Sequence, residues 1–182
     1  MTREETTEFL SKLLETTRLS GIGKYSAKEV SLSWGTKNER RVDYMEFCPS
    51  SQICVSDIEK GIFICYEIKS CRQDVFSGNG LNFVGEKNYI VTTMECWKDI
   101  GEDYRSGRLV DHIKECNPNN LTFKFGVMVA VPVGHKPEDE FMNPTPLDAD
   151  CRWELAIAKP CLQGCRSMAM SELLFCMLRS GR

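Results

Sequence analysis

The stretch Ile62-Phe63-Ile64-Cys65-Tyr66-Glu67-Ile68-Lys69 decides the fold class of this chain. Its first five residues form a continuous apolar run, which is typical of a central strand covered on both faces. Successive side chains of a strand point to opposite faces, so Glu67 and Lys69 share one face and Ile68 points to the other. The stretch therefore predicts a buried strand that ends in two charged side chains on one side of a sheet.

The other elements are expected from hydrophobic periodicity and from turn-forming residues. Strands are predicted at 30–34, 41–47, 89–93, 123–131 and 153–158, and helices at 2–18, 71–76, 94–116 and 167–179, the third of them interrupted near 101–107. Residues 134–150 are rich in Pro, Asp, Glu and Asn and predict a surface loop. This order predicts an α/β fold with a mixed central sheet flanked by helices.

Chain length and net charge limit the domain organisation and the mode of nucleic-acid binding. The chain has 182 residues, enough for one domain with a substantial core. We expect a single domain over 1–182, with its core at about 25–135 and a C-terminal strand and helix within 151–180. The formal net charge is −3, so any contact with nucleic acid must use a local basic face.

Ten cysteines raise the question of disulfides or zinc. No CxxC pair exists, and the closest spacing is Cys161 to Cys165, so zinc-finger and zinc-ribbon patterns are missing. Many cysteines have apolar neighbours, and the N-terminus is polar and acidic, unlike a secretory signal. No apolar run approaches the ~20 residues that cross a bilayer. We expect reduced, mostly buried cysteines in a cytoplasmic protein with no membrane partner.

The strand at 41–47 carries an acidic residue that can complete a metal site. If this strand pairs with the one at 62–69, Asp43 comes alongside Glu67. Two carboxylates then bind one hard divalent cation, and the carbonyl oxygen of Ile68 is a third ligand. Mg²⁺, or Mn²⁺ in its place, accepts one or two carboxylates together with water and a phosphate oxygen. Lys69 supplies an ammonium group beside that phosphate. The alternative is that these residues are solvated charges at strand ends.

This arrangement resembles the PD-(D/E)XK nuclease superfamily, and in particular its MmcB-like branch of bacterial and phage proteins linked to DNA repair. The resemblance rests on Arg41-Val42-Asp43, on Tyr66-Glu67-Ile68-Lys69-Ser70 and on Phe125 to Pro132, and spans roughly 25–135. Val42 stands where the superfamily name places proline. The resemblance implies a restriction-endonuclease-like core, metal ligands at Asp43 and Glu67, and a catalytic lysine at Lys69.

Further residues are candidates for contacts around such a site. Glu29 is a candidate extra acidic ligand. Arg72 and Lys87 are candidates for phosphate contacts, with Gln73 and Asn82 as polar helpers near the backbone or a base edge. For each of them a solvated surface position is the competing interpretation. Neither His112 nor His135 lies near a nucleophile signature, and no GxxxxGK[ST] phosphate loop occurs.

Two functional hypotheses remain open at this level. The first is a Mg²⁺-dependent endonuclease that acts on double-stranded DNA. The second is a catalytically idle protein that reuses the fold: the chain also resembles phage anti-CRISPR inhibitors, which implies binding to a CRISPR effector nuclease with its guide RNA and to double-stranded DNA. An intact Asp43, Glu67 and Lys69 set favours the enzyme. A homodimer is open in either case, and no segment of the sequence identifies an interface.

Overall fold

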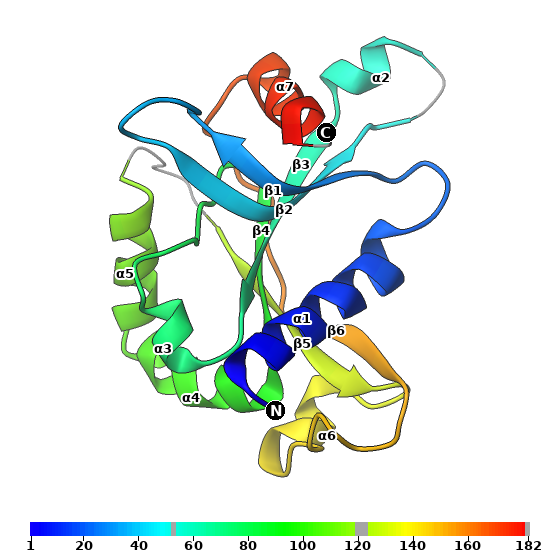
Figure 1. Ribbon diagram of the computed structural model, residues 1–182, viewed down its shortest axis with the longest axis vertical. Coiled ribbons are helices and arrows are strands. Elements are labelled where there is room, and N and C mark those ends of the chain that lie inside the picture. Colours follow the sequence, from blue (N-terminus) through cyan, green and yellow to red (C-terminus); the bar gives the residue numbers. More distant parts are fainter. Residues whose placement is uncertain (52–53, 119–123, 181–182) are drawn as a thin grey trace.

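Six strands form one mixed sheet in which the order in space follows the order in the chain (Figure 1). The computed structural model describes residues 1–51, 54–118 and 124–180. The strands are β1 (Tyr25–Leu32), β2 (Arg40–Cys48), β3 (Ile62–Lys69), β4 (Lys87–Thr93), β5 (Gly126–Pro132) and β6 (Trp153–Lys159). The pairs β1–β2 and β2–β3 are antiparallel, the pairs β3–β4 and β4–β5 are parallel, and β6 is antiparallel to β5.

The helices differ in length and in the signals that start them. They are α1 (Arg3–Leu14), which continues as the π-helical turn η1 (Glu15–Leu19), α2 (Ser56–Glu59), α3 (Arg72–Val75), α4 (Met94–Arg105), α5 (Arg108–Cys116), α6 (Pro137–Met142) and α7 (Met170–Ser180). Thr2 and Glu5 form a capping box at the start of α1, and the Thr93 hydroxyl accepts a hydrogen bond from Cys96 N at the start of α4. No helix in the described ranges is both long and apolar enough to cross a membrane.

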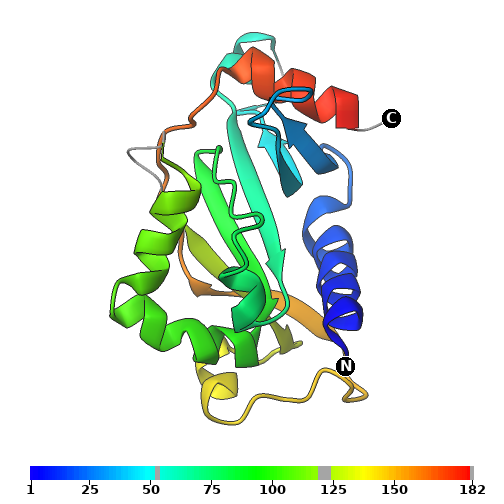
Figure 2. The same cartoon turned by 60° about the vertical axis from the view of Figure 1, so that its left-hand side comes forward.

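Helices cover both faces of the sheet, so its central strands are buried on both sides. In β5, Val127, Val129 and Val131 pack toward α4 and α5, whereas Met128 and Ala130 pack toward α1. Figure 2 shows α1 on one side of the sheet and α4 and α5 on the other. This alternation explains why β5 has buried residues only, as a strand covered on both faces should.

The helix α7 packs over β1 and β2 on the same face of the sheet as α4 and α5. Phe63 and Cys65 of β3 belong to its hydrophobic cluster, whereas Tyr66 and Ile68 belong to the cluster under α1. By alternation, Glu67 and Lys69 point to the face that carries α4, α5 and α7.

The predicted fold class is confirmed as α/β with a mixed sheet between helices, and several boundaries differ from the prediction. β1 begins at Tyr25 rather than 30 and ends before Ser33, which has a positive φ of 52° in the turn. The predicted surface loop 134–150 contains α6. The helical stretch 94–116 is broken where expected, at Gly107. The start of the strand predicted at 123–131 lies outside the described residues.

Candidate metal centre

The strands β2 and β3 separate in the middle of the sheet and form a fork. Their pairing ends at Tyr44 opposite Tyr66, although β2 remains paired with β1 as far as Arg40 and β3 with β4 as far as Lys69. Continuing the register by one residue puts Asp43 next to Glu67. Directly opposed residues of antiparallel strands present their side chains on the same face. The fork therefore brings Asp43 and Glu67 together at the point where the strands diverge.

The carboxylate of Asp43 replaces the missing strand partner of β3. Its Oδ2 accepts a hydrogen bond of 2.8 Å from the backbone N–H of Ile68. In an extended strand the N–H and C=O groups of one residue face the same neighbouring strand, so the Ile68 carbonyl also faces the fork. Burial raises the pKa of Asp43, against the lowering effects of the Ile68 N–H and of the Lys69 charge. Asp43 and the Ile68 carbonyl are thus two oxygen groups directed at one space.

Glu67 is fully buried, and only one of its two carboxylate oxygens is satisfied. Oε1 accepts a hydrogen bond of 3.1 Å from the backbone N–H of Asn82, whereas Oε2 has no hydrogen-bond partner in the described part of the chain. A methyl group in place of the Gly80 hydrogen would stand 2.5 Å from Oε2. Burial, with a further contribution from the Asp43 charge, raises the pKa of Glu67 to about 8.

Lys69 holds its ammonium group beside these carboxylates, and its side chain is only 5% exposed. Nζ donates a hydrogen bond of 2.7 Å to the carbonyl oxygen of Asn79 and lies 3.8 Å from Oδ1 of Asp74. Asp74 in turn accepts hydrogen bonds from the backbone N–H and the hydroxyl of Ser70. The segment that carries Asn79 and Gly80 therefore closes over both Lys69 and Glu67.

A polar cavity of about 700 Å³ opens at the fork between α1 and residues 78–80. Asp43, Ile68 and Lys69 line it, and Glu67 lies directly behind Gly80. Its rim carries charges of both signs: Glu29, Glu39 and Asp74 are acidic, and four basic side chains come from the start of α1, from β1 and from the start of β2. These are Arg3, Lys28, Arg40 and Arg41.

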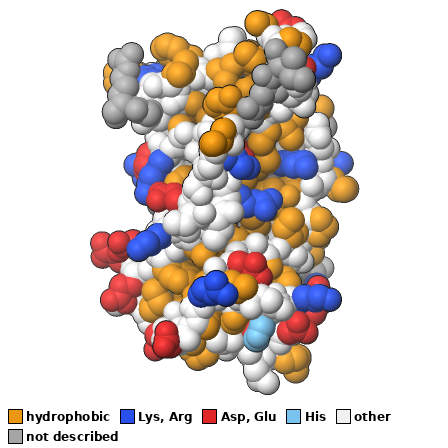
Figure 3. Space-filling view, turned by 90° about the vertical axis from the view of Figure 1, so that its right-hand side faces the viewer, with side chains coloured by type: hydrophobic (Ala, Val, Ile, Leu, Met, Phe, Trp, Pro, Cys, Tyr) orange, Lys and Arg blue, Asp and Glu red, His pale blue; other side chains and the backbone are white. Residues whose placement is uncertain are grey.

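The two rim arginines with carboxylate partners remain accessible to a ligand. Arg3 pairs with Asp74 at 2.6 Å and Arg41 with Glu29 at 2.6 Å, and each arginine side chain is 62% exposed. On the face shown in Figure 3, Lys and Arg side chains are interspersed with hydrophobic and acidic ones. Arg3 and Arg41 therefore present exposed guanidinium groups at the cavity rim, each beside its carboxylate partner.

Of the four residues predicted to contact DNA, one lies at the cavity. Asn82 lines it, and its side-chain amide donates to the carbonyl oxygen of Arg41 at 2.7 Å, which is a structural contact. Arg72 makes two hydrogen bonds with Asp103, of 2.7 and 2.9 Å. Gln73 is exposed on α3 and does not line the cavity. Lys87 is opposite Ile64, at the far end of β3 from Lys69.

The cavity residues differ in how far the sequence could have identified them. Glu29 lines the cavity but is paired with Arg41, and its φ of 56° marks an irregularity in β1 beside Asp43. Arg40 and Arg41 lie three and two residues before Asp43, so their place near the cavity could be predicted from the sequence. Arg3 and Lys28 reach the cavity only through packing of α1 and β1, for which the sequence holds no local signal.

The residues at the fork fit a divalent cation with few protein ligands. Oε2 of Glu67 is buried without a hydrogen-bond partner among the described residues, and Gly80 approaches it so closely that a Cβ there would stand 2.5 Å away, so this oxygen could serve as a cation ligand. No group of three or more His, Cys, Asp or Glu in the described ranges is arranged to hold a metal ion. Mg²⁺ suits this set, since one or two carboxylates with a backbone carbonyl and waters suffice for it.

The cysteines do not gather at this site, and fewer are buried than expected. All ten are free, but only Cys65, Cys96, Cys161 and Cys176 are buried. The prediction of mostly buried cysteines is wrong because several lie in loops or at strand ends, where apolar sequence neighbours do not bring burial.

In comparisons with known proteins, no family model, no curated protein and no solved structure matches this chain.

Proposed function

We propose that this protein is a metal-dependent phosphodiesterase that acts on double-stranded DNA, with a restriction-endonuclease-like core of the PD-(D/E)XK type. The observation that carries the proposal is the unpartnered, fully buried Oε2 of Glu67, at a fork that also holds Asp43 and Lys69. A buried carboxylate oxygen without a hydrogen-bond partner is costly to keep. A cation-binding role accounts for that cost, whereas a solvated strand-end charge would be exposed.

The order of the elements supports the same proposal. The resemblance found in the sequence implies a helix, three strands and a further helix, with the acidic residue on the second strand and Glu-x-Lys on the third. The elements α1, β1, β2, β3 and α3 follow that order with the short helix α2 inserted between β2 and β3; Asp43 lies on β2, and Glu67 and Lys69 lie on β3.

In the proposed site, Asp43, Glu67 and the Ile68 carbonyl hold Mg²⁺ or Mn²⁺. When bound, such a cation supplies a water of lowered pKa and stabilises negative charge on the phosphate in the transition state. Glu67 must lose its proton for this, because burial keeps the carboxyl protonated up to a pKa of about 8. Asp43 keeps its hydrogen bond from the Ile68 N–H, which holds the carboxylate toward the fork.

Lys69 is the proposed catalytic cation. Its ammonium group donates to the Asn79 carbonyl, and a phosphate oxygen that enters the cavity would replace that neutral acceptor with a charged one. Hydrogen bonds to charged acceptors are shorter and roughly twice as strong as neutral ones. Lys69 would then stabilise charge that develops on the phosphate and orient the attacking water. Arg3, Arg40 and Arg41 would contact the flanking phosphates.

Cleavage of supercoiled plasmid DNA with Mg²⁺ or Mn²⁺, and with EDTA, tests the proposal. We expect nicking that needs the cation, and a rate lower by at least about 100-fold for Lys69→Ala, because removal of one transition-state donor has an effect of that size. Lys114→Ala is the matched control, since this lysine is exposed on α5 and pairs only with Asp111 of the same helix. It should cleave like the unaltered protein.

Calorimetric titration with Mn²⁺ separates the metal site from the reaction. Asp43→Asn and Glu67→Gln should each abolish binding, whereas Lys69→Ala should retain it. Binding of Mn²⁺ without any cleavage would refute the enzymatic part of the proposal. Duplex binding with neither metal binding nor cleavage would favour the idle inhibitor of a guide-RNA nuclease instead.

A further inference from the structure

The helix α7 carries apolar side chains on its outer side as well as on its inner side. Leu173, Cys176 and Met177 are buried against the sheet, whereas Phe175 is 62% exposed and Leu178 is 75% exposed. The outward side of a surface helix normally carries polar and charged side chains, so large apolar ones there are unusual. The outer side of α7 is therefore a face that lacks a cover in the isolated chain.

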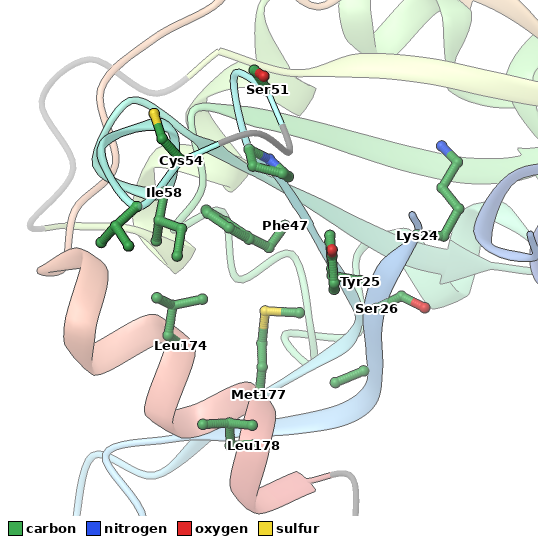
Figure 4. Close-up of a pocket in the computed structure, with 13 residues that line it drawn as sticks. Lys24, Tyr25, Ser26, Phe47, Ser51, Cys54, Ile58, Leu174, Met177 and Leu178 are labelled. Atoms are coloured by element: carbon green, nitrogen blue, oxygen red, sulfur yellow. The ribbon is translucent and has the colours of Figure 1, made fainter. Parts of the chain in front are cut away.

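An apolar groove of about 840 Å³ runs along this helix. Phe47 and Met177 form its buried floor, and the exposed side chains of Val55 and Ile58 form the wall that faces α7. In Figure 4, Leu174 and Met177 point from α7 into the groove toward Phe47 and Ile58. The groove and the outer side of α7 form one continuous apolar surface, because Leu178 belongs to both.

Opposite charges lie at the two ends of the same surface. Glu172 is in the first turn of α7 and Arg179 in the last, seven residues or about two helical turns apart. Phe175 lies between them, on the same side of the helix. The guanidinium of Arg179 stands 5.3 Å from the centroid of the Trp34 ring and donates to the Ser31 carbonyl. Glu172 forms no salt bridge with any described residue.

We propose that α7 and the adjoining groove form the interface of a homodimer, in which α7 of a second copy lies antiparallel to α7. About a twofold axis near Phe175, Glu172 of each copy faces Arg179 of the other, so the surface is complementary to itself in charge. Such isologous contacts are the commonest kind in homo-oligomers. Phe175 and Leu178 of each copy would fill the groove of the other.

The proposed dimer needs more surface than α7 alone offers. A stable interface buries about 800 Å² on each partner, more than one pair of short helices provides. The walls of the groove therefore take part, and they add Tyr25, Val55 and Ile58, which are all exposed in the isolated chain.

The chemistry of the groove disfavours nucleic acid as the occupant. Lys24 lines the groove, but its ammonium group is paired with Glu46 at 2.9 Å. The remaining lining residues are apolar or are small neutral polar ones, so a phosphate backbone would gain little there. By contrast, α7 of a second copy, which is apolar with one charge near each end, would bury apolar surface in the groove and form ion pairs.

Sedimentation analysis of the full chain from about 1 to about 100 µM tests this proposal, a range in which interfaces of moderate affinity dissociate. Dimer should form as concentration rises. Leu178→Asp should abolish it, whereas Met142→Asp should not, because Met142 is equally exposed at 75% but lies on α6. Monomer at every concentration, or dimer that survives Leu178→Asp, would overturn the interface.

A charge exchange tests the antiparallel orientation. Glu172→Arg should weaken dimerisation on the order of tenfold, and the double variant Glu172→Arg with Arg179→Glu should restore it. A lack of restoration, in a double variant whose thermal unfolding matches that of Glu172→Arg, would refute the antiparallel pairing. None of these measurements depends on cleavage, so the dimer and the proposed reaction stand or fall separately.

Discussion

At the residue scale, the protonation of Glu67 links the proposed site to the stability of the fold. Its carboxyl has a pKa of about 8 in the folded chain, against an ordinary value of 4.5. The folded chain therefore holds this proton over a pH range in which the unfolded chain releases it. The contribution of the Glu67 carboxyl to the free energy of unfolding is fully present below pH 4.5 and is lost as the pH rises through about 8.

We predict that the free energy of unfolding in EDTA falls between about pH 5 and about pH 9 by at most about 5 kcal/mol because of Glu67. Glu67→Gln should remove this contribution and unfold at higher urea than the unaltered protein at the alkaline end. Urea titrations of both chains across this range measure it. Parallel curves for the two chains would show that Glu67 does not titrate in this way.

Gly80 and Gly78 permit a comparison of two substitutions that differ only in what a methyl group meets. Both have a φ of +77°, but a Cβ at Gly80 would stand 2.5 Å from Oε2 of Glu67, whereas nothing lies within 4 Å of one at Gly78. Each alanine should lower the free energy of unfolding by about 1 kcal/mol through its positive φ. Gly80→Ala alone should also weaken Mn²⁺ binding, by at least about tenfold, because its methyl would press against Oε2 of Glu67, the proposed ligand oxygen.

Calorimetric Mn²⁺ titrations of Gly80→Ala and Gly78→Ala test this difference in affinity. Equal affinities would mean that the space beside Gly80 is not where the cation lies.

At the scale of the elements, the start of β2 and the helix α3 offer arginines with different roles. Arg41 lies on the cavity rim with its side chain 62% exposed, whereas Arg72 is held by both oxygens of Asp103. Binding to a phosphate backbone releases counterions, so each contact adds to the salt dependence of affinity. We predict that Arg41→Gln reduces the slope of log affinity against log salt by about 1.

Arg72→Gln serves as the comparison. It should leave the salt slope unchanged and instead lower the free energy of unfolding, since Asp103 would lose both hydrogen bonds from Arg72 and keep only the longer contact with Arg108, at 3.6 Å. Salt titrations of duplex binding, together with urea unfolding, measure both effects. A lower salt slope for Arg72→Gln and not for Arg41→Gln would reverse the two assignments.

The elements themselves were predicted with uneven success, for physical reasons. The apolar run of β3 is a local signal, and this strand was found with the expected bounds. The placement of Lys87 near the cavity needed the direction of β4, which local sequence does not contain. Because β4 runs parallel to β3, Lys87 stands beside Ile64, whereas an antiparallel β4 would have brought it toward Lys69. The partner of Arg72, Asp103, is likewise fixed only by the packing of α3 on α4.

At the scale of the whole molecule, the α/β class and the mixed sheet followed from the order of the elements. The approach of Asp43 to Glu67 was also expected, from strand parity alone. The sequence could not show the fork. The β2–β3 pairing ends at Tyr44 because β2 stays paired with β1 beyond that point and leaves β3. The closure of residues 78–80 over Glu67 is equally a long-range property, visible in the sequence only as two glycines.

The fork also gives this sheet an edge in its interior. Beyond Tyr66, the side of β3 that faces β2 has no strand partner, and one carboxylate, from Asp43, takes the place of a ladder. An exposed strand edge invites another extended chain to pair with it. Here α1 and residues 78–80 flank the opening, and Arg3, Arg40 and Arg41 stand beside it, so little room is left for a further strand. Under the proposed function, the gap in the hydrogen-bond ladder that would be an aggregation hazard elsewhere takes a phosphate backbone in place of another strand.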